Sequence, residues 1–302
     1  MNLQTSGGER PGVTLVVLAA GRATRYGGVK PLAPVGLAGE AVIDVLASDA
    51  LAAGFERLVL VVGKETGPSI RYHVARTWPG TVPVEFADQE SPRGTVDAVL
   101  AAAPVLHDGS PFGVANADDL PGVAGLGLLA GHLRRGDQAN AVVCYRLRGS
   151  LLGDSPVTRG LCRVDAEGML EAVDERRRVT PQPDGRIVAD DGREPKELDP
   201  DELVSMNLWG FTPEMRVVLE EALSSASGDG EVLLPEVVDE LLAERRAGVT
   251  GATKVKVLHA PGRCVGVTHP GDVTLVQAEL AREVGRGERP AHLWAAEPHG
   301  RS

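Results

Sequence analysis

The feature that most constrains the fold is a short run, residues 13–18 (VTLVVL), that is apolar apart from Thr14. A continuous apolar run of this length indicates a strand buried on both faces, as in a parallel sheet. Small residues, Ala19 to Gly21, follow it directly, and a turn of small residues lets backbone N–H groups approach an anion. Three cations then surround the loop: Arg22, Arg25 and Lys30. The stretch therefore predicts a buried strand that ends in a basic, phosphate-binding loop.

Strands and helices are predicted to alternate through the first half of the chain. The expected strands after the first are 57–62, 82–87 and 112–115, and the expected helices are 40–54, 66–77 and 95–103. This alternation implies βαβ units with right-handed crossovers, and hence a mostly parallel sheet. Ligands of such sheets bind beyond the carboxyl ends of the strands, where the polar and glycine-containing loops of this sequence lie.

The order of predicted strands and helices is different in the second half of the chain. We expect strands at 139–147, at 160–173 (two strands around a turn at Asp165–Gly168), at 203–211 and at 253–258, and helices at 215–225, 234–244 and 273–284, the last capped by Asp272. Residues 180–200 are predicted to form an exposed loop or short hairpin. The fold class is therefore α/β, with a Rossmann-like mixed, mainly parallel sheet sandwiched by helices. We expect one domain over 13–284, in which 13–135 binds nucleotide and 136–284 binds the second substrate, between a disordered lead-in (1–12) and a tail (285–302).

Composition excludes several classes of function. The formal net charge of −11 argues against non-specific binding of nucleic acid or anionic membranes, so a phosphate site must be a local positive pocket. The three cysteines form no CxxC pair and predict free thiols, without a disulfide frame or zinc site. Neither a signal peptide nor a membrane span is apparent, which predicts a cytoplasmic protein.

The basic loop matches neither common nucleotide motif, because GxxxxGK[ST] and GxGxxG are both absent. This leaves a dinucleotide oxidoreductase as a distant third hypothesis. The pattern that is present, LAAGxxTRxGGxKPL over 18–32, closely resembles the N-terminal motif of the sugar-phosphate nucleotidylyltransferases. The resemblance implies the fold of nucleotide-diphospho-sugar transferases, which is of the GT-A type, and transfer of a nucleotide from a triphosphate to a sugar phosphate.

The resemblance assigns roles around this loop. Arg25 is expected to hold the leaving pyrophosphate and Lys30 to contact the transferred or substrate phosphate, with backbone groups of Ala20 and Gly21 at the triphosphate. One position departs from the family, because Ala23 stands where a second glycine is usual. If that position has a left-handed backbone, alanine costs roughly 1–2 kcal/mol.

Two further segments match the nucleotide side of the family. Gln89, Gly94 and Thr95 resemble the base-binding segment, in which an amide offers a donor and an acceptor to a base edge. Asp118 matches the position of a metal-binding aspartate directly after a strand, and we expect Mg²⁺ as the cofactor because carboxylate and phosphate oxygens suit that ion. Asp119 is expected to contact substrate or to support the metal site.

The sugar side of the resemblance is carried by Glu175 and Asn207, which are expected to bind the second substrate, with Arg176 in place of the lysine that usually follows the glutamate. A second metal-binding aspartate is common in the family, but Gly266 occupies that register and has no side chain to act as a ligand. Thr268 and His269 therefore stay open as alternatives.

The expected activity is Mg²⁺-dependent transfer of a nucleoside monophosphate from an NTP to a sugar 1-phosphate or sugar-like phosphate, with release of pyrophosphate. Two alternatives remain open: a cytidylyltransferase for a non-sugar phosphate or phosphonate, and a non-catalytic sensor that binds nucleotide or nucleotide-sugar. Ala23 and Gly266 are the features that favour the sensor. The base, the acceptor and the oligomeric state, a homo-oligomer included, are not specified by the sequence.

Overall fold

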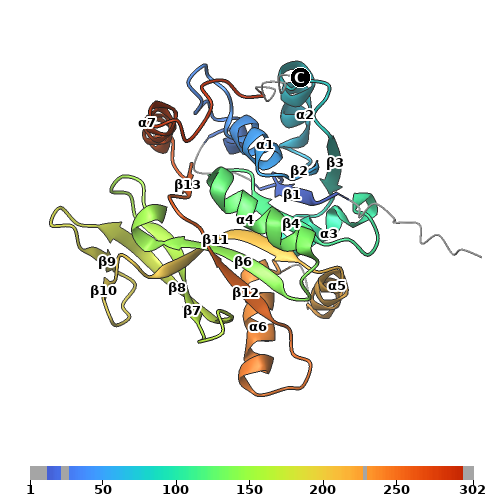
Figure 1. Ribbon diagram of the computed structural model, residues 1–302, viewed down its shortest axis with the longest axis vertical. Helices are drawn as coiled ribbons and strands as arrows, with labels where there is room; N and C mark the ends of the chain where they lie inside the picture. Colours follow the sequence, from blue (N-terminus) through green and yellow to red (C-terminus); the bar gives the residue numbers. More distant parts are fainter. Residues whose placement is uncertain (1–11, 22–26, 227–229, 295–302) are drawn as a thin grey trace, which may run out of the picture.

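The computed structural model describes residues 12–21, 27–226 and 230–294 (Figure 1). Its strands are β1 (Thr14–Leu18), β2 (Arg57–Gly63), β3 (Val84–Gln89), β4 (Phe112–Asn116), β5 (Asp119–Leu120), β6 (Asn140–Arg146), β7 (Val157–Val164), β8 (Leu170–Pro181), β9 (Ile187–Ala189), β10 (Glu197–Leu198), β11 (Leu203–Phe211), β12 (Val255–His259) and β13 (Val265–Gly266). Its α-helices are α1 (Val42–Ala52), α2 (Gly67–Thr77), α3 (Thr95–Ala101), α4 (Gly122–Arg135), α5 (Met215–Ser225), α6 (Leu234–Arg246) and α7 (Asp272–Gly285).

The centre of the sheet is parallel, as the alternating pattern predicted. Strands β3, β2, β1 and β4 lie side by side in that order. From β1 the chain moves outward through β2 to β3 and then returns across β1 to form β4 on its other side. Open α/β sheets bind ligands at such a reversal, because the crossovers on its two sides turn away from each other and leave a crevice. The described residues that directly follow β1 and β4 lie together at this edge of the sheet, where the N–H of Ala117 donates to the carbonyl of Leu18.

The other half of the sheet is antiparallel and is organised around β11. One edge of β11 pairs with β4 through Trp209–Phe211 and with β7 through Val204 and Ser205, while β6 pairs with β11 as well. A register shift separates Ser205 from Leu208 in the pairing with β6, and Asn207 within it has a φ of 55°. The bulge bends β11 between its two partners, and a non-glycine residue in this conformation is uncommon enough to mark a functional position.

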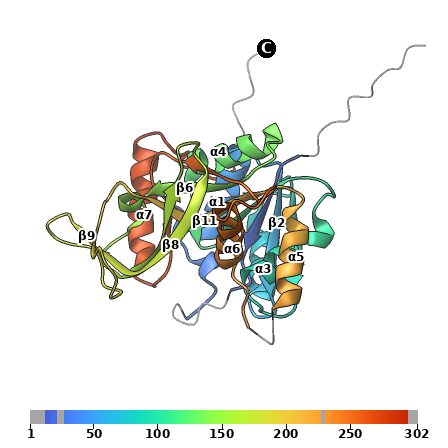
Figure 2. The ribbon, with the colours of Figure 1, turned by 90° about the horizontal axis from the view of Figure 1, so that it is seen from below.

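Helices cover both faces of the sheet (Figures 1 and 2). Helices α1, α2, α4 and α7 bury their apolar residues on one face, which includes Leu15, Val17 and Leu58. Helices α3, α5 and α6 cover the other face, which includes Val16, Val59 and Trp209. Alternate residues of β1 thus enter different cores, and this explains why its sequence is continuously apolar. The prediction of a helix-sandwiched, mainly parallel sheet is confirmed.

A third, smaller core lies under the β7–β10 extension at the edge of the sheet, the end most distant from α3 and α5 in Figures 1 and 2. Its buried residues are Leu147, Leu151, Leu161, Val179, Ile187, Ala189, Leu198 and Val204. The extension includes residues 180–200, where the predicted loop or short hairpin proves to be a hairpin: β8 pairs with β9, and β9 with β10.

Several elements differ from the predictions. Helix α4 was not predicted, because glycines 122, 125, 127 and 131 interrupt its apolar pattern. Gly125 is needed there, since a Cβ at this position would lie 2.0 Å from the hydroxyl of Tyr145, which donates to the carbonyl of Pro121. The two-stranded β5–β13 pair was also not predicted, because strands of two residues carry no periodic signal.

The predicted cap of the last helix is a further correction. Asp272 is the first residue of α7, and its carboxylate accepts from the backbone N–H groups of Thr268 and His269, which precede the helix. Asp272 therefore closes the preceding turn. Residues beyond α7 also pack on the protein: Arg289 is buried against Asp49, and the rings of Trp294 and Trp78 lie 5.4 Å apart.

The three cysteines are free, as predicted, although the sulfurs of Cys144 and Cys162 lie 3.4 Å apart. Among the helices within the described ranges, none has the length and apolarity needed to cross a membrane.

Candidate active site

The loops after β1 and β4 meet through an ion pair. The Nζ atom of Lys30 lies 3.3 Å from Oδ2 of Asp118, and both side chains are partly accessible, at 21% and 33%. Lys30 begins a 3-10 helix (Lys30–Leu32) with Pro31 buried beneath it, which fixes the direction of the lysine. Asp118 is the second residue after β4. A cation and a carboxylate thus lie together beyond the carboxyl ends of β1 and β4, where the strand order reverses.

Asp119 lies deeper than Asp118. Its carboxylate accepts a hydrogen bond of 3.1 Å from the amide of Asn116, at the end of β4. Burial raises the pKa of Asp119 from 3.8 to about 7, and the charge of Asp118 contributes to the rise, while the hydrogen bond from Asn116 opposes it. Two adjacent carboxylates in one site, one of them poorly solvated, form an environment that favours a bound cation.

Gly266 explains why the side chain of Asp119 has room. A Cβ at position 266 would lie 2.2 Å from Oδ1 of Asp119, and β13 pairs Gly266 with Asp119 in register. The space that a side chain at 266 would need is therefore filled by the Asp119 carboxylate. The register that usually carries a second aspartate in the resembling family has lost its side chain, and a carboxylate reaches the same place from the neighbouring strand.

The residues present fit a magnesium ion. Within the described ranges no group of three or more His, Cys, Asp or Glu side chains could hold a metal alone. Mg²⁺ is commonly held by only one or two carboxylates, with water and substrate phosphates completing an octahedron. Asp118 and Asp119 supply two carboxylates at the edge of the crevice, which suits that mode of binding.

A cavity of about 840 Å³ opens beside this carboxylate pair, where β11 passes from β4 to β7. Asp118, Asp119, Glu175 and Asn207 all line it, so four of the predicted site residues come together. Asn207 reaches the cavity from the bulge in β11. The cavity is large enough for a small-molecule substrate.

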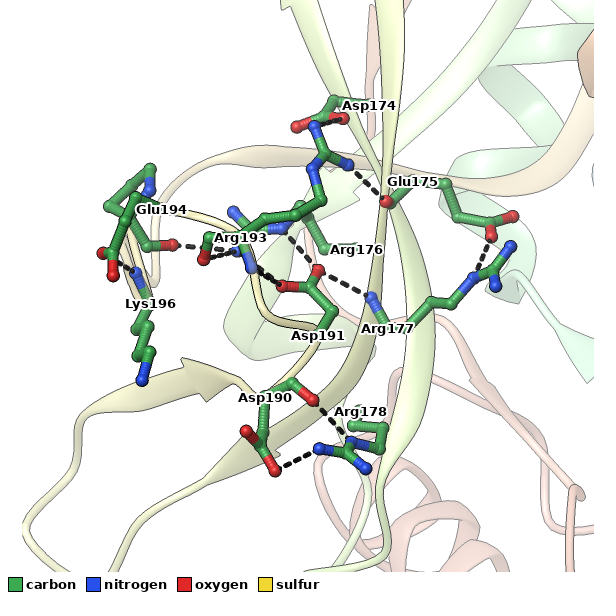
Figure 3. Close-up of polar contacts among 11 residues, drawn as sticks. Asp174, Glu175, Arg176, Arg177, Arg178, Asp190, Asp191, Arg193, Glu194 and Lys196 are labelled. Carbon is green, nitrogen blue, oxygen red and sulfur yellow. Dashed lines mark hydrogen bonds and ion pairs between the residues drawn. The ribbon is translucent and has the colours of Figure 1, made fainter.

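The arginine next to Glu175 does not have the predicted position. Successive side chains of a strand point to opposite faces, so Glu175 and Arg177 lie on one side of β8 and Arg176 on the other (Figure 3). Arg176 is 2% exposed, and its guanidinium donates to Asp191 and to backbone carbonyls beyond it. Arg177 lines the cavity and donates to Glu175 at 2.9 Å. The cation beside Glu175 in the cavity is therefore Arg177, and Arg176 stabilises the β8–β10 extension.

Sequence reasoning missed Arg159 on β7. Its side chain lines the large cavity and also a smaller one of about 40 Å³ that it shares with Asp119, Thr268 and Gly266. The guanidinium donates to the hydroxyl and the carbonyl of Ser150. Burial lowers the pKa of Arg159, and within the described ranges no carboxylate lies within 4.0 Å of it. The charge of Asp119 acts on Arg159 only from beyond that distance, so the largely buried guanidinium has no direct ion-pair partner and is suited to bind an anion. No signal for this was present in the sequence, because β7 carries two arginines, Arg159 and Arg163, and nothing in the local pattern distinguishes them.

The predicted base-binding residues lie apart from that cavity. The Gln89 amide donates to the carbonyl of Gly94 at 3.1 Å and to Asp97 at 2.7 Å. Gly94 has a φ of 92°, and a Cβ there would lie 2.5 Å from the carbonyl oxygen of Val232. The hydroxyl of Thr95 accepts from the N–H of Leu234, the first residue of α6. Each residue has a clear structural role, and their contact with a base stays a prediction.

Only part of the basic loop is described. Ala20 is half-buried and Gly21 exposed at the end of β1, and the carbonyl of Ala20 approaches Gly63 at the end of β2. Arg25, like Arg22 and Ala23, lies outside the described residues. Its assignment to the leaving pyrophosphate stays a prediction.

Solved structures of two proteins share this fold over nearly their full length. A UDP-glucose pyrophosphorylase complexed with UDP-glucose is 16% identical, covers 91% of this chain with 99% of its own, and has a TM-score of 0.59. HddC from Yersinia pseudotuberculosis complexed with GMP-PN is 15% identical, with coverages of 88% and 99% and a TM-score of 0.57. A second structure of HddC, for which no ligand is named, is 14% identical, with the same coverages and a TM-score of 0.58.

No curated protein sequence matches the chain. The family of MobA-like NTP transferase domains, however, matches residues 15–185, more than half of the chain, from β1 through β8. That range includes the basic loop, both aspartates after β4, Arg159 and Glu175. The protein therefore belongs to the MobA-like NTP transferase family and is a nucleotidyltransferase, as the loop motif predicted.

Proposed function

We propose that this nucleotidyltransferase transfers a nucleoside monophosphate from an NTP to a sugar 1-phosphate or a sugar-like phosphate, with Mg²⁺ as cofactor and pyrophosphate as the second product. The observation that carries the proposal is the Lys30–Asp118 ion pair, which stands between the phosphate-binding loop and the large cavity. The description of one structural neighbour, a UDP-glucose pyrophosphorylase complexed with UDP-glucose, supports an acceptor of this class.

The two substrates are assigned to different sides of that ion pair. The triphosphate belongs with the loop after β1, while the acceptor belongs in the cavity lined by Glu175 and Asn207. An oxygen of the acceptor phosphate attacks the α-phosphorus of the NTP, a new P–O bond forms, and the bond to pyrophosphate breaks. The acceptor phosphate is already a nucleophile, so the enzyme needs neither a covalent intermediate nor a strong general base.

The chain's own residues act by position and charge. Asp118 and Asp119 would hold Mg²⁺, which neutralises charge on the triphosphate and the transferred phosphoryl group. Lys30 lies beside Asp118 and approaches the phosphates without any rearrangement of the strands. Arg159 binds the acceptor phosphate, because its largely buried guanidinium lines the cavity and forms no direct ion pair within the described ranges. Fixed charges of this kind stabilise the transition state without reorganisation.

The experiment is a pyrophosphate-release assay on the purified protein with Mg²⁺, each common NTP in turn, and a panel of sugar 1-phosphates and related monoesters. Asp118→Asn should lower turnover by roughly 10³-fold while the melting temperature stays close to that of the wild type. The matched control is Asp108→Asn, which changes a carboxylate 98% exposed near the other end of β4. An absence of pyrophosphate release from every NTP and acceptor combination would contradict the proposal.

A further inference from the structure

The beginning of α6 forms one wall of the large cavity. The residues of this wall are Leu233, Pro235, Glu236, Asp239 and Glu240, and we refer to them as the α6 wall. Glu175 from β8 and Asn207 from β11 line the same cavity. The space that an acceptor can occupy therefore depends on where the first turn of α6 is held.

The first turn of α6 begins without a polar cap residue. Its N-cap is Leu233, whose aliphatic side chain cannot accept a hydrogen bond. The N–H groups of Glu236 and Val237 donate to the carbonyl of Leu233, and Pro235 carries no N–H group. These bonds leave the N–H of Leu234 to be satisfied from outside the helix, and Leu234 is only 2% exposed. A partner from the protein is therefore needed.

Thr95, the first residue of α3, is that partner. Its hydroxyl accepts from the N–H of Leu234 at 2.7 Å. The backbone of the same segment adds two bonds: the N–H of Val232 donates to the carbonyl of Arg93 at 2.9 Å, and the N–H of Val96 donates to the carbonyl of Val232 at 3.1 Å. The start of α3 thus holds the entry into α6 by its side chain and by its backbone.

The other end of α6 is held by different contacts. Arg245, in the last turn of the helix, donates to Asp165 at 2.7 Å and to the carbonyl of Leu170 at 3.4 Å. Arg246 donates to the carbonyl of Glu171. These bonds fix the end of α6 against β8 and the turn that precedes it. Loss of the Thr95 hydroxyl would therefore release the beginning of the helix, where the α6 wall lies, and leave its end in place.

We propose that Thr95 is a positioning residue for the acceptor, because its hydroxyl caps α6 and thereby sets the α6 wall. The described residues that line the large cavity do not include Thr95, so it acts on the acceptor through the helix. The family resemblance assigns Thr95 to the nucleotide, whereas this contact assigns its hydroxyl to the acceptor side. This inference rests on the proposed function, since it requires the acceptor to occupy the large cavity.

The experiment removes the hydroxyl and keeps the shape of the side chain. Pyrophosphate release by Thr95→Val is measured at varied NTP and varied acceptor, with Mg²⁺ and with the NTP and the panel acceptor that react fastest. We expect the acceptor KM to rise by about 3-fold to 30-fold, the range that corresponds to a lost helix cap. The NTP KM and kcat should change little. Thr95→Ala should give the same shift, and Thr95→Ser, which keeps the hydroxyl, should restore the acceptor KM.

Hydrogen exchange gives a readout that does not depend on activity. In Thr95→Val the amides of residues 234–237 should exchange faster than in the wild type, whereas those of the last turn of α6 should not change. The matched control is Thr66→Val, because the Thr66 hydroxyl also accepts from a backbone N–H, that of Gly63 at 3.1 Å, in a turn away from the cavity lining. This control should leave the acceptor KM and the exchange of α6 as in the wild type.

The outcomes separate this inference from the proposed function. A rise in the NTP KM with an unchanged acceptor KM would overturn the inference and place Thr95 at the nucleotide. Equal rises in both constants, no change in either, or a Thr95→Ser variant as impaired as Thr95→Val would also overturn it. Each of these results would leave the proposed function intact. No release by the wild type with any NTP and any acceptor would overturn the proposed function and, with it, this inference.

Discussion

Arg159 and Arg176 lie opposite each other on β7 and β8, yet their surroundings differ completely. Arg176 donates to Asp191 at 2.7 Å and fills its remaining donors with backbone carbonyls of the loop between β9 and β10. Arg159 donates only to uncharged oxygens, and within the described ranges it has no carboxylate partner. Of these two arginines on neighbouring strands, Arg176 thus has its charge neutralised by an ion pair, whereas Arg159 does not.

The pKa values of the aspartates near these two arginines, Asp191 and Asp119, differ in the same way. The hydrogen bonds from Arg176 hold the pKa of Asp191 well below its usual range. Asp119, which lines both cavities with Arg159, has a pKa raised to about 7 because burial outweighs the hydrogen bond from Asn116 and the more distant positive charges of Arg159 and Lys30. The satisfied pair stabilises the edge of the fold, whereas the unsatisfied pair borders the cavities. Both residues are arginines, so residue type does not distinguish them. The arginine without a direct ion pair is the one that lines the cavities, and its environment therefore indicates the functional side of the sheet.

In the comparison of the two arginines, the largest effect should follow removal of the charge at Arg159. Arg159→Met keeps an apolar stem of similar length but loses the guanidinium, and we expect kcat/KM for the acceptor to fall by about 10²-fold. The KM for the NTP should change little, because none of the described residues that follow β1, 19–21 and 27–32, lines the cavity of Arg159. Initial rates of pyrophosphate release at varied acceptor and varied NTP measure the two constants separately.

Two comparisons test this assignment. Arg159→Lys should recover part of the loss, since an ammonium group keeps the charge without the planar fork. Arg176→Met, with activity normalised to the amount of folded protein, should leave kcat/KM within a few-fold of the wild type. If Arg176→Met lowered acceptor kcat/KM as much as Arg159→Met does, the distinction between the two arginines would be wrong.

Much of the site could be predicted from the sequence, because several of its residues lie in loops that directly follow predicted strands. The alternation of strands and helices predicted the parallel centre, and the carboxyl ends of β1 and β4 then placed Lys30 near Asp118. Glu175 and Asn207 were predicted through the family resemblance and do line one cavity with Asp118 and Asp119. Local pattern is sufficient where the functional residue stands at the end of a regular element.

The other features of the site and fold could not be predicted, because they depend on contacts between residues far apart in the sequence or on close packing. Arg176 and Arg177 are adjacent in sequence, and only the register of β8 decides which one enters the cavity. The role of Gly266 depends on its pairing with Asp119, about 150 residues away in the chain. Helix α4 escaped prediction because its glycines serve packing, as at Gly125 beneath Tyr145. Long-range register and close packing are decided by the tertiary structure.

The next largest effect should be a loss of stability at the satisfied pair. Arg176→Met would leave Asp191 without the donors that hold it and would release the loop that Arg176 binds through backbone carbonyls. We expect the melting temperature to fall by roughly 5–15 °C, as when one partner of a buried ion pair is removed. Differential scanning calorimetry measures the shift, and Arg178→Met, which alters an arginine 63% exposed on the same strand, is the control. An equal shift in both variants would contradict the special role of Arg176.

The two aspartates should give opposite dependences of stability on pH. For Asp119, the pKa is higher in the folded than in the unfolded chain, so its contribution is complete below pH 4 and is lost as pH rises toward 7. For Asp191, the folded pKa is lowered, so its contribution is complete above pH 4 and is lost as pH falls below that value.

Urea unfolding of the metal-free protein, in the presence of a chelator, tests these signs. Relative to Asp119→Asn, the wild type should lose roughly 2–4 kcal/mol of unfolding free energy between pH 4 and pH 7. Relative to Asp191→Asn, it should lose stability only in more acidic solution. Parallel curves for the wild type and Asp119→Asn over pH 4–7 would show that Asp119 is ordinarily ionised and that the contrast with Asp191 is false.

The smallest effect concerns the turn that brings Thr268 to the same two cavities as Arg159. Asp272 holds that turn by accepting from the N–H groups of Thr268 and His269, both at 2.7 Å. Asp272→Asn keeps one oxygen acceptor but removes the charge, which should cost about 0.5–1.5 kcal/mol. We expect the acceptor KM to rise by about 2-fold to 5-fold with kcat nearly unchanged, because the turn shapes the cavity without contacting the reacting phosphates. Gln277→Glu, on the same helix and donating to Pro34, is the control, and it should leave the acceptor KM as it is. A drop in kcat without a change in KM for Asp272→Asn would place this turn at the reacting groups and extend the functional side of the sheet beyond Arg159.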